Sequence, residues 1–74
     1  MTTLEKKILD KLFGNCKSDW NRHARLGFTI YESEEEYIED SLLALCDEED
    51  ARRGLKFLDK VEVDGKNYLV SFNL

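Results

Sequence analysis

The sequence is poor in the residues that mark linkers, disulfide frameworks and metal sites. Its 74 residues include no proline, one histidine and two cysteines. Because no proline, repeat or low-complexity stretch divides the chain, we expect one domain over residues 1–74. Cys16 and Cys46 could pair, but their separation of 30 residues matches no metal knuckle or dense disulfide framework, so we expect free thiols that are buried or half-buried. No metal and no cofactor is expected.

Long apolar runs are also missing. No stretch approaches the roughly 20 apolar residues that cross a bilayer, and the polar start from Met1 to Lys7 lacks the apolar centre of a signal peptide. We therefore expect a soluble, cytoplasmic protein. With 42% apolar and 36% charged residues the chain should fold around a small core. A chain of this size buries only about 60% of its unfolded surface.

Catalytic motifs are absent from the sequence. It contains no glycine-rich phosphate loop, no serine nucleophile elbow and no cluster of metal ligands. Cys16 and Asp19 lie near the single histidine, His23, but a catalytic pair requires a hydrogen bond that sequence spacing does not establish. We therefore expect a protein that binds a partner and is not an enzyme.

A β-hairpin is predicted at residues 61–72. Asp64 and Gly65 are a favoured pair for a two-residue type I′ turn, in which both positions need a positive φ. That turn sets Val63 opposite Lys66, and period-2 alternation then gives one face five apolar side chains, namely Val61, Val63, Tyr68, Val70 and Phe72. The other face receives Glu62, Asn67, Ser71 and Leu69. We expect Leu69 to be a single exposed leucine.

A helix from Asp47 to about Lys60 is predicted before the hairpin. Asp47 is a suitable N-cap, and the acids after it suit the positive end of the helix dipole. Helical spacing puts Ala51, Leu55 and Leu58 on one face, with Phe57 on its flank and Gly54 permitting close packing. The opposite face collects the basic residues Arg52, Arg53, Lys56 and Lys60. Such a stripe is either an ordinary solvated face or a binding surface.

The N-terminal half predicts a helix and a strand. Thr2 and Glu5 have capping-box spacing, and the apolar residues of a helix follow at Leu4, Ile8, Leu9, Leu12 and Phe13 until Gly14 and Asn15. Residues 16–27 receive no firm assignment, although Ser18 and Asp19 could start a short extra helical turn. Residues 26–31 are β-branched and aromatic, so we expect a strand that joins the hairpin as its third member.

A second helix is predicted after this strand. Ser33 and Glu36 form another capping-box pair. The apolar face of this helix should contain Ile38, Leu42, Leu45 and Cys46. The predicted elements therefore follow the order α-β-α-α-β-β, which is an α+β fold with a C-terminal hairpin.

This order resembles the winged-helix variant of the helix-turn-helix proteins over most of the chain. The passage from Leu55 to Val70 is similar to the part of small regulators that joins the recognition helix to the wing. The resemblance implies a small winged-helix-like domain whose wing tip is Asp64-Gly65-Lys66, and its members commonly dimerise. Two features differ from the pattern: the segment from Cys16 to Arg25 is long, and the turn around Cys46-Asp47 is nearly absent.

DNA binding is the function that this resemblance implies. Arg52, Arg53 and Lys56 would face the major groove, and Lys66 would reach a phosphate or the minor groove. The four acids from Asp47 to Asp50 oppose this reading, because DNA carries about one negative charge per 1.7 Å of its axis. Glu49, three and four residues before the two arginines, would also occupy them in ion pairs.

Negative charge is concentrated in the middle of the chain. Between Glu32 and Asp50 lie ten of the sixteen acids and none of the eleven lysines and arginines, so this segment carries −10 and the rest +5. We use the name acidic ridge for Glu36, Glu39 and Asp40 together with Leu43 beside them. The acidic ridge is either a soluble outer face or, with the run Asp47, Glu48, Glu49 and Asp50, a surface for a basic protein.

The sequence favours a protein partner slightly over DNA. That partner could be a nucleic-acid-handling protein whose DNA site the acids block, as small inhibitors of the phage type do. DNA binding through residues 47–60 and the 61–72 wing is the alternative. Trp20, Arg22 and Arg25 form a further candidate contact patch, because tryptophan and arginine are enriched in binding hot spots, although Trp20 also suits the core.

Overall fold

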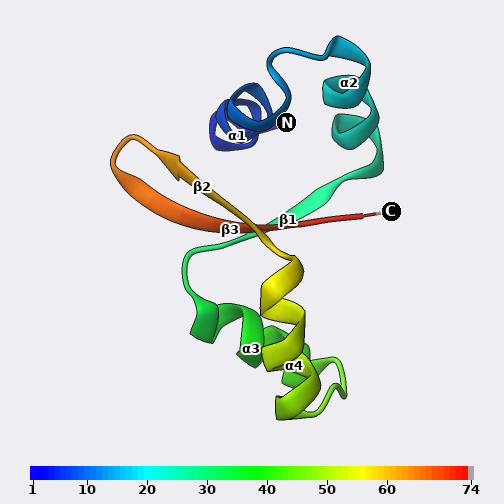
Figure 1. Cartoon of the computed structure of the whole chain (residues 1–74), viewed down its shortest axis with the longest axis vertical. Helices are drawn as coiled ribbons and strands as arrows, with labels where there is room; N and C mark the ends of the chain where they lie inside the picture. Colours follow the sequence, from blue (N-terminus) through cyan, green and yellow to red (C-terminus); the bar gives the residue numbers. More distant parts are fainter. Residues whose placement is uncertain (74) are drawn as a thin grey trace.

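A computed structural model of the protein describes residues 1–73, which form an α+β fold with three strands (Figure 1). The helices are α1 (Thr3–Phe13), α2 (Lys17–Leu26), α3 (Glu34–Leu43), α4 (Glu48–Gly54) and the short 3-10 helix η1 (Leu55–Phe57). The strands are β1 (Phe28–Tyr31), β2 (Asp59–Val63) and β3 (Lys66–Phe72). The predicted order is confirmed, with α2 added in the segment that the sequence left unassigned.

The C-terminal hairpin has the predicted turn and register. Asp64 and Gly65 have φ values of 52° and 81°, as a type I′ turn requires, and Val63 lies opposite Lys66. The third strand is also confirmed, because β1 pairs antiparallel with β3 and places Phe28 opposite Phe72. The strand order is β1-β3-β2, so β3 is the central strand.

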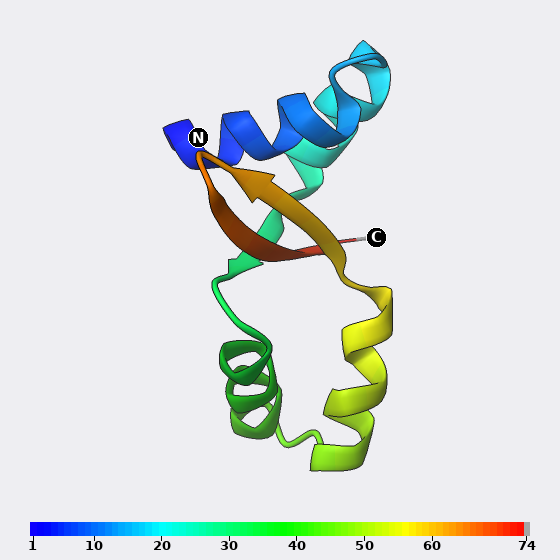
Figure 2. The ribbon, with the colours of Figure 1, turned by 60° about the vertical axis from the view of Figure 1, so that its left-hand side comes forward.

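The core lies between α1 and one face of the sheet, which α1 crosses in Figure 2. Ile8 from α1 and Val70 from β3 are fully buried, and Val61 and Val63 complete the buried cluster. The partly buried residues around it are Leu4, Leu12, Phe28, Ile30, Tyr68 and Phe72. The Thr2 capping box that starts α1 is confirmed, since Glu5 N–H donates to Thr2 Oγ1 and Thr2 N–H donates to Glu5 Oε1.

The prediction that Leu69 is exposed is wrong. Leu69 is only 8% exposed and lies opposite Tyr31, which is 7% exposed, on the face of the sheet away from α1. Tyr37 from α3 packs edge-on against the Tyr31 ring at a centroid distance of 5.2 Å. Tyr31 and α3 therefore partly cover the second face of the sheet as well. The alternation of residues within the hairpin does not reveal this, because both neighbours lie outside the hairpin.

The predicted helix from Asp47 to Lys60 is too long. Its Asp47 cap is confirmed, because the Asp47 side chain accepts from Asp50 N–H, but α4 ends at Gly54 and η1 ends at Phe57. Leu58 is already extended, with φ −83° and ψ 142°, because β2 begins one residue later. Lys60 therefore lies in β2 and does not belong to a helical basic stripe.

The segment that the sequence left unassigned forms α2, which is attached to α1 by Trp20. The Trp20 Nε1–H donates to Asp10 Oδ1 at 2.9 Å, and the indole is half-buried outside the main core cluster. Both cysteines are free: Cys16, just before α2, is exposed, which contradicts the predicted burial, and Cys46 is half-buried. Cys16 is exposed because it lies in the connection between two surface helices.

The apolar face predicted for α3 is only partly buried. Ser33 caps the helix by accepting from Glu36 N–H, but Glu36 Oε2 accepts from Glu32 N–H, so the predicted reciprocal pair is incomplete. Ile38 is half-buried, whereas Leu42 is 44% and Leu45 is 97% exposed. The reason is that α3 and α4 pack together at one end of the molecule, away from the α1 core (Figures 1 and 2).

The expectation that the turn between α3 and α4 is nearly absent is also wrong. Four residues, 44–47, separate the end of α3 from the start of α4. Leu45 has a φ of 64° in this turn, a left-handed conformation that is uncommon for a leucine. Residues 44–47 therefore form a turn between the two helices, with an exposed leucine in it.

Replacement of Gly54 tests the contact between α3 and α4. A Cβ at position 54 would overlap the Tyr37 hydroxyl, so we expect Gly54→Ala to lower the free energy of unfolding by about 1–2 kcal/mol, despite its better helix propensity. Chemical denaturation measures the loss. Adding Tyr37→Phe removes the overlapping oxygen and should restore the stability, and an equally unstable double variant would show that the packing is different.

Candidate binding surfaces

The acidic ridge is a continuous feature of the structure. Glu36, Glu39, Asp40 and Leu43 line one side of a groove of about 320 Å³, and Thr29, Ile30 and Tyr31 of β1 line the other. The ridge carboxylates are exposed, and Leu43 is 82% exposed among them. The fold thus brings the predicted ridge residues together and adds β1, which the sequence did not associate with them.

Tyr31 connects the ridge to the sheet. Its hydroxyl donates a hydrogen bond of 2.8 Å to Asp40 Oδ2. Burial raises the pKa of Tyr31 to about 12, with further contributions from the hydrogen bond to Asp40 and from the negative charge of that carboxylate. The hydrogen bond holds Asp40 against β1, while the side chain of the neighbouring Glu39 makes no hydrogen bond or ion pair within residues 1–73.

The acids from Asp47 to Asp50 are engaged within α4. Asp47 caps the helix, Glu48 pairs with Arg52 at 2.9 Å, and Glu49 pairs with Arg53 at 2.8 Å. The predicted pairing of Glu49 with Arg53 is confirmed, but Arg52 pairs with Glu48, which lies four residues before it. The two arginines thus partly balance the charge of this run, whereas no lysine or arginine forms an ion pair with a ridge carboxylate in residues 1–73.

The four basic residues proposed for DNA do not form one free surface. Arg52 and Arg53 are in the ion pairs of α4, and Lys66 Nζ lies 2.8 Å from Glu32 Oε1, a contact that raises the pKa of Lys66. Lys56 is exposed and makes no ion pair within the described chain. Figure 2 shows the β2–β3 turn, next to which Lys66 lies, beside α1 and far from the start of α4.

The patch proposed around Trp20 lies on α2, apart from the ridge. Arg22 and Arg25 are exposed, whereas Trp20 is half-buried and committed to Asp10. Trp20 therefore serves to position α2, and of the three residues of this patch only the two arginines lie freely in solvent.

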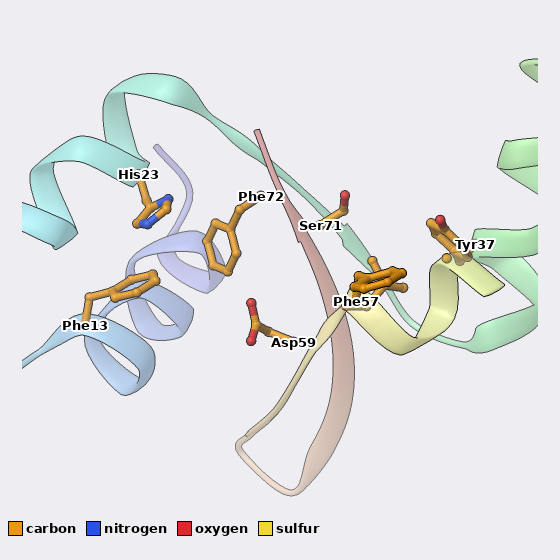
Figure 3. Close-up of a pocket in the computed structure, with 9 residues that line it drawn as sticks. Phe13, His23, Tyr37, Phe57, Asp59, Ser71 and Phe72 are labelled. Carbon is orange, nitrogen blue, oxygen red and sulfur yellow. The ribbon is translucent and has the colours of Figure 1, made fainter. Parts of the chain in front are cut away.

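Sequence reasoning missed a second groove, of about 430 Å³, beside the end of the sheet (Figure 3). His23 stacks on Phe13 at 4.4 Å and contacts Phe72 at 4.7 Å between ring centroids, and its buried Nδ1 has no hydrogen-bond partner in residues 1–73. Asp59 and Phe57 line the groove further along. Because these residues come from separate elements, no local spacing in the sequence indicates the groove.

His23 makes no side-chain hydrogen bond with Cys16 or Asp19 in residues 1–73, so no catalytic pair is formed there. The Cys16 thiol lies 3.4 Å from Ser18 Oγ, and the His23 ring packs against Phe13 and Phe72. Within residues 1–73 no cluster of three or more histidine, cysteine or acidic side chains is arranged to hold a metal ion. No helix of the described chain is long and apolar enough to cross a membrane.

The ionisation of Tyr31 gives a test of this geometry. A tyrosine with an ordinary pKa of 10.0 in the unfolded chain and about 12 in the fold favours folding fully below pH 10 and loses this contribution as the pH rises toward 12. We expect the free energy of unfolding to fall over this window, and to fall less in Tyr31→Phe. Denaturation at several pH values measures it, and identical pH profiles of the two proteins would contradict the burial of Tyr31.

Comparisons of the chain with protein-family models, with curated protein sequences and with solved structures give no match.

Proposed function

We propose that this protein is a small, non-enzymatic binding protein that uses the acidic ridge to bind a basic surface of another protein. The observation that carries the proposal is Leu43, a leucine that is 82% exposed between acidic residues and beside a groove. Exposed apolar residues with a polar rim are typical of protein interfaces. Leu45, 97% exposed in the following turn, adds apolar surface to the same end of the molecule.

The charge distribution supports a basic partner. The segment from Glu32 to Asp50 contains ten acids and no lysine or arginine. The negative electrostatic field of these acids accelerates the encounter with a positively charged surface and disfavours partners of like charge. A nucleic-acid-handling protein has a surface of this kind at its nucleic-acid site, so an inhibitor or modulator of the phage type fits the charge.

We also propose that the fold is a winged-helix variant with α2 inserted. With α2 set aside, the elements follow the order α, β, α, α, β, β. The turn of four residues between α3 and α4 has about the length usual in helix-turn-helix pairs, and a tight hairpin follows η1. On this proposal α3 and α4 are the helix-turn-helix pair, and the same scaffold serves protein binding.

DNA binding remains the alternative because the arginines of α4 are accessible. The side chains of Arg52 and Arg53 are 63% and 68% exposed. Exposed ion pairs contribute only about 0–1 kcal/mol, so both arginines can exchange their acids for phosphate. The acids that remain at the start of α4 would still repel the DNA backbone.

Two variants with opposite consequences separate these functions. The ridge variant carries Glu36→Gln, Glu39→Gln and Asp40→Asn, which keep the hydrogen-bond acceptors of the side chains. The α4 variant carries Arg52→Ala and Arg53→Ala. We expect a protein captured from cell extract by the unmodified chain to be retained by the α4 variant and lost, at least about tenfold, by the ridge variant, because the ridge supplies the attraction.

Binding to mixed-sequence duplex DNA completes this test. We expect no binding even at about 50 mM salt, where phosphate contacts are strongest. Binding that weakens steeply between about 50 and 200 mM salt and disappears in the α4 variant would establish the alternative and refute the protein-binding proposal.

A further inference from the structure

The outer edge of β1 has unpaired backbone groups. The two-residue turn makes Val63 and Lys66 a hydrogen-bonded pair, so alternate residues of β3 bond to β2 and the others bond to β1. The hydrogen bond from Asn73 N–H to Gly27 O, 3.2 Å long, follows the same alternation. The amide and carbonyl groups of Phe28 and Ile30 therefore point away from β3, toward the open edge.

No other strand in residues 1–73 pairs with this edge. No hydrogen bond of the described chain reaches the outward groups of Phe28 or Ile30. The next outward amide, that of Glu32, donates to Glu36 Oε2 at 3.0 Å. At Glu32, the Glu36 carboxylate thus accepts the hydrogen bond that the backbone carbonyl of an added strand would otherwise accept.

The two edges of the sheet differ in their protection. Proteins commonly protect an open strand edge with charged side chains, which prevent another chain from pairing with it. Three of the five residues of β2, the other edge strand, are charged, whereas β1 reads Phe-Thr-Ile-Tyr and carries no charge. The unprotected edge is the one that borders the groove of the acidic ridge.

We propose that an extended basic segment of the partner protein adds to β1 as a fourth strand, a mode that rests on the proposed function and specifies how the ridge is used. Side chains alternate between the two faces of a strand. On the α3 side, every second residue of the added segment meets Glu36, Glu39 and Asp40. On the α1 side, its residues extend the apolar face formed by Phe28 and Ile30.

The segment recognised is therefore one in which lysine or arginine alternates with apolar residues. A second copy of this chain is a poor occupant, because two ridges would meet with like charge. The sequence of β1 also lacks any basic residue to offer in return.

The test uses the full chain and a seven-residue peptide in which lysine and valine alternate. We expect the peptide to bind and to slow hydrogen exchange at the amides of Phe28 and Ile30, but not at the outward amides of Lys60 and Glu62 on the β2 edge. The same peptide methylated on its backbone amides along both edges keeps its charge but cannot pair with a strand. It should bind at least about tenfold more weakly.

Two protein variants test whether the charge of the acidic ridge, rather than the overall charge of the protein, attracts the peptide. Glu39→Lys reverses a ridge charge and should weaken the binding of the unmethylated peptide about fivefold. Glu62→Lys makes the same change at the β2 edge and should leave the binding of this peptide unaffected. Neither side chain makes a hydrogen bond or ion pair within residues 1–73, so both variants should fold.

Three results would overturn the inference. Equal binding of both peptides without protection of Phe28 and Ile30 would leave an acidic protein-binding ridge that does not use the strand edge. Absence of peptide binding would also reject strand addition, while the proposed function would still be decided by capture with the ridge variant. Protection of the same amides in the free protein, together with a dimeric mass, would make a second copy the occupant.

Discussion

The position of β3 between β1 and β2 is the constraint on which the rest of the structure depends. Within residues 1–73 the two outer strands do not pair with each other, so β3 is the one strand to which each of them is hydrogen-bonded. Val70, at the middle of this pairing, is fully buried in the same cluster as Ile8, which couples the sheet to α1. The α3–α4 pair is joined to the core at its two ends, through β1 and through β2. The position of the acidic α3–α4 end of the molecule therefore depends on how β3 pairs with both outer strands.

Much of this register was predictable because it depends on local rules. Asp64 and Gly65 determine a turn, the turn determines the pairing, and the pairing determines the apolar face. The capping residues Thr2 and Asp47 likewise mark the starts of helices from short-range hydrogen bonds. The predicted α+β order follows from such signals.

The errors arise where tertiary contacts determine the outcome. Leu69 is buried because Tyr31, from a distant part of the sequence, lies opposite it. The helix before β2 stops early because Asp59 must pair with Val70. For the candidate site, the sequence identified the ridge acids through helical spacing, but it did not place them beside β1, since that proximity depends on how the chain turns after the strand. The basic residues show the opposite case. Their number suggested one DNA-binding surface, but Arg52, Arg53 and Lys66 form ion pairs, and Lys66 lies far from the start of α4.

The central position of β3 also affects how the chain folds during synthesis. β1 is made before β2 and β3, yet the strand with which it pairs in the described chain is β3, whose residues 66–72 are made last among the three strands. Until then the uncharged segment Phe-Thr-Ile-Tyr has two open edges, and such segments are prone to pair with other chains. The acids that follow it from Glu32 onward leave the ribosome directly after it. Their mutual repulsion would keep nascent chains apart during this interval, so the charge that we propose attracts a partner to the folded protein would also protect the unfinished one.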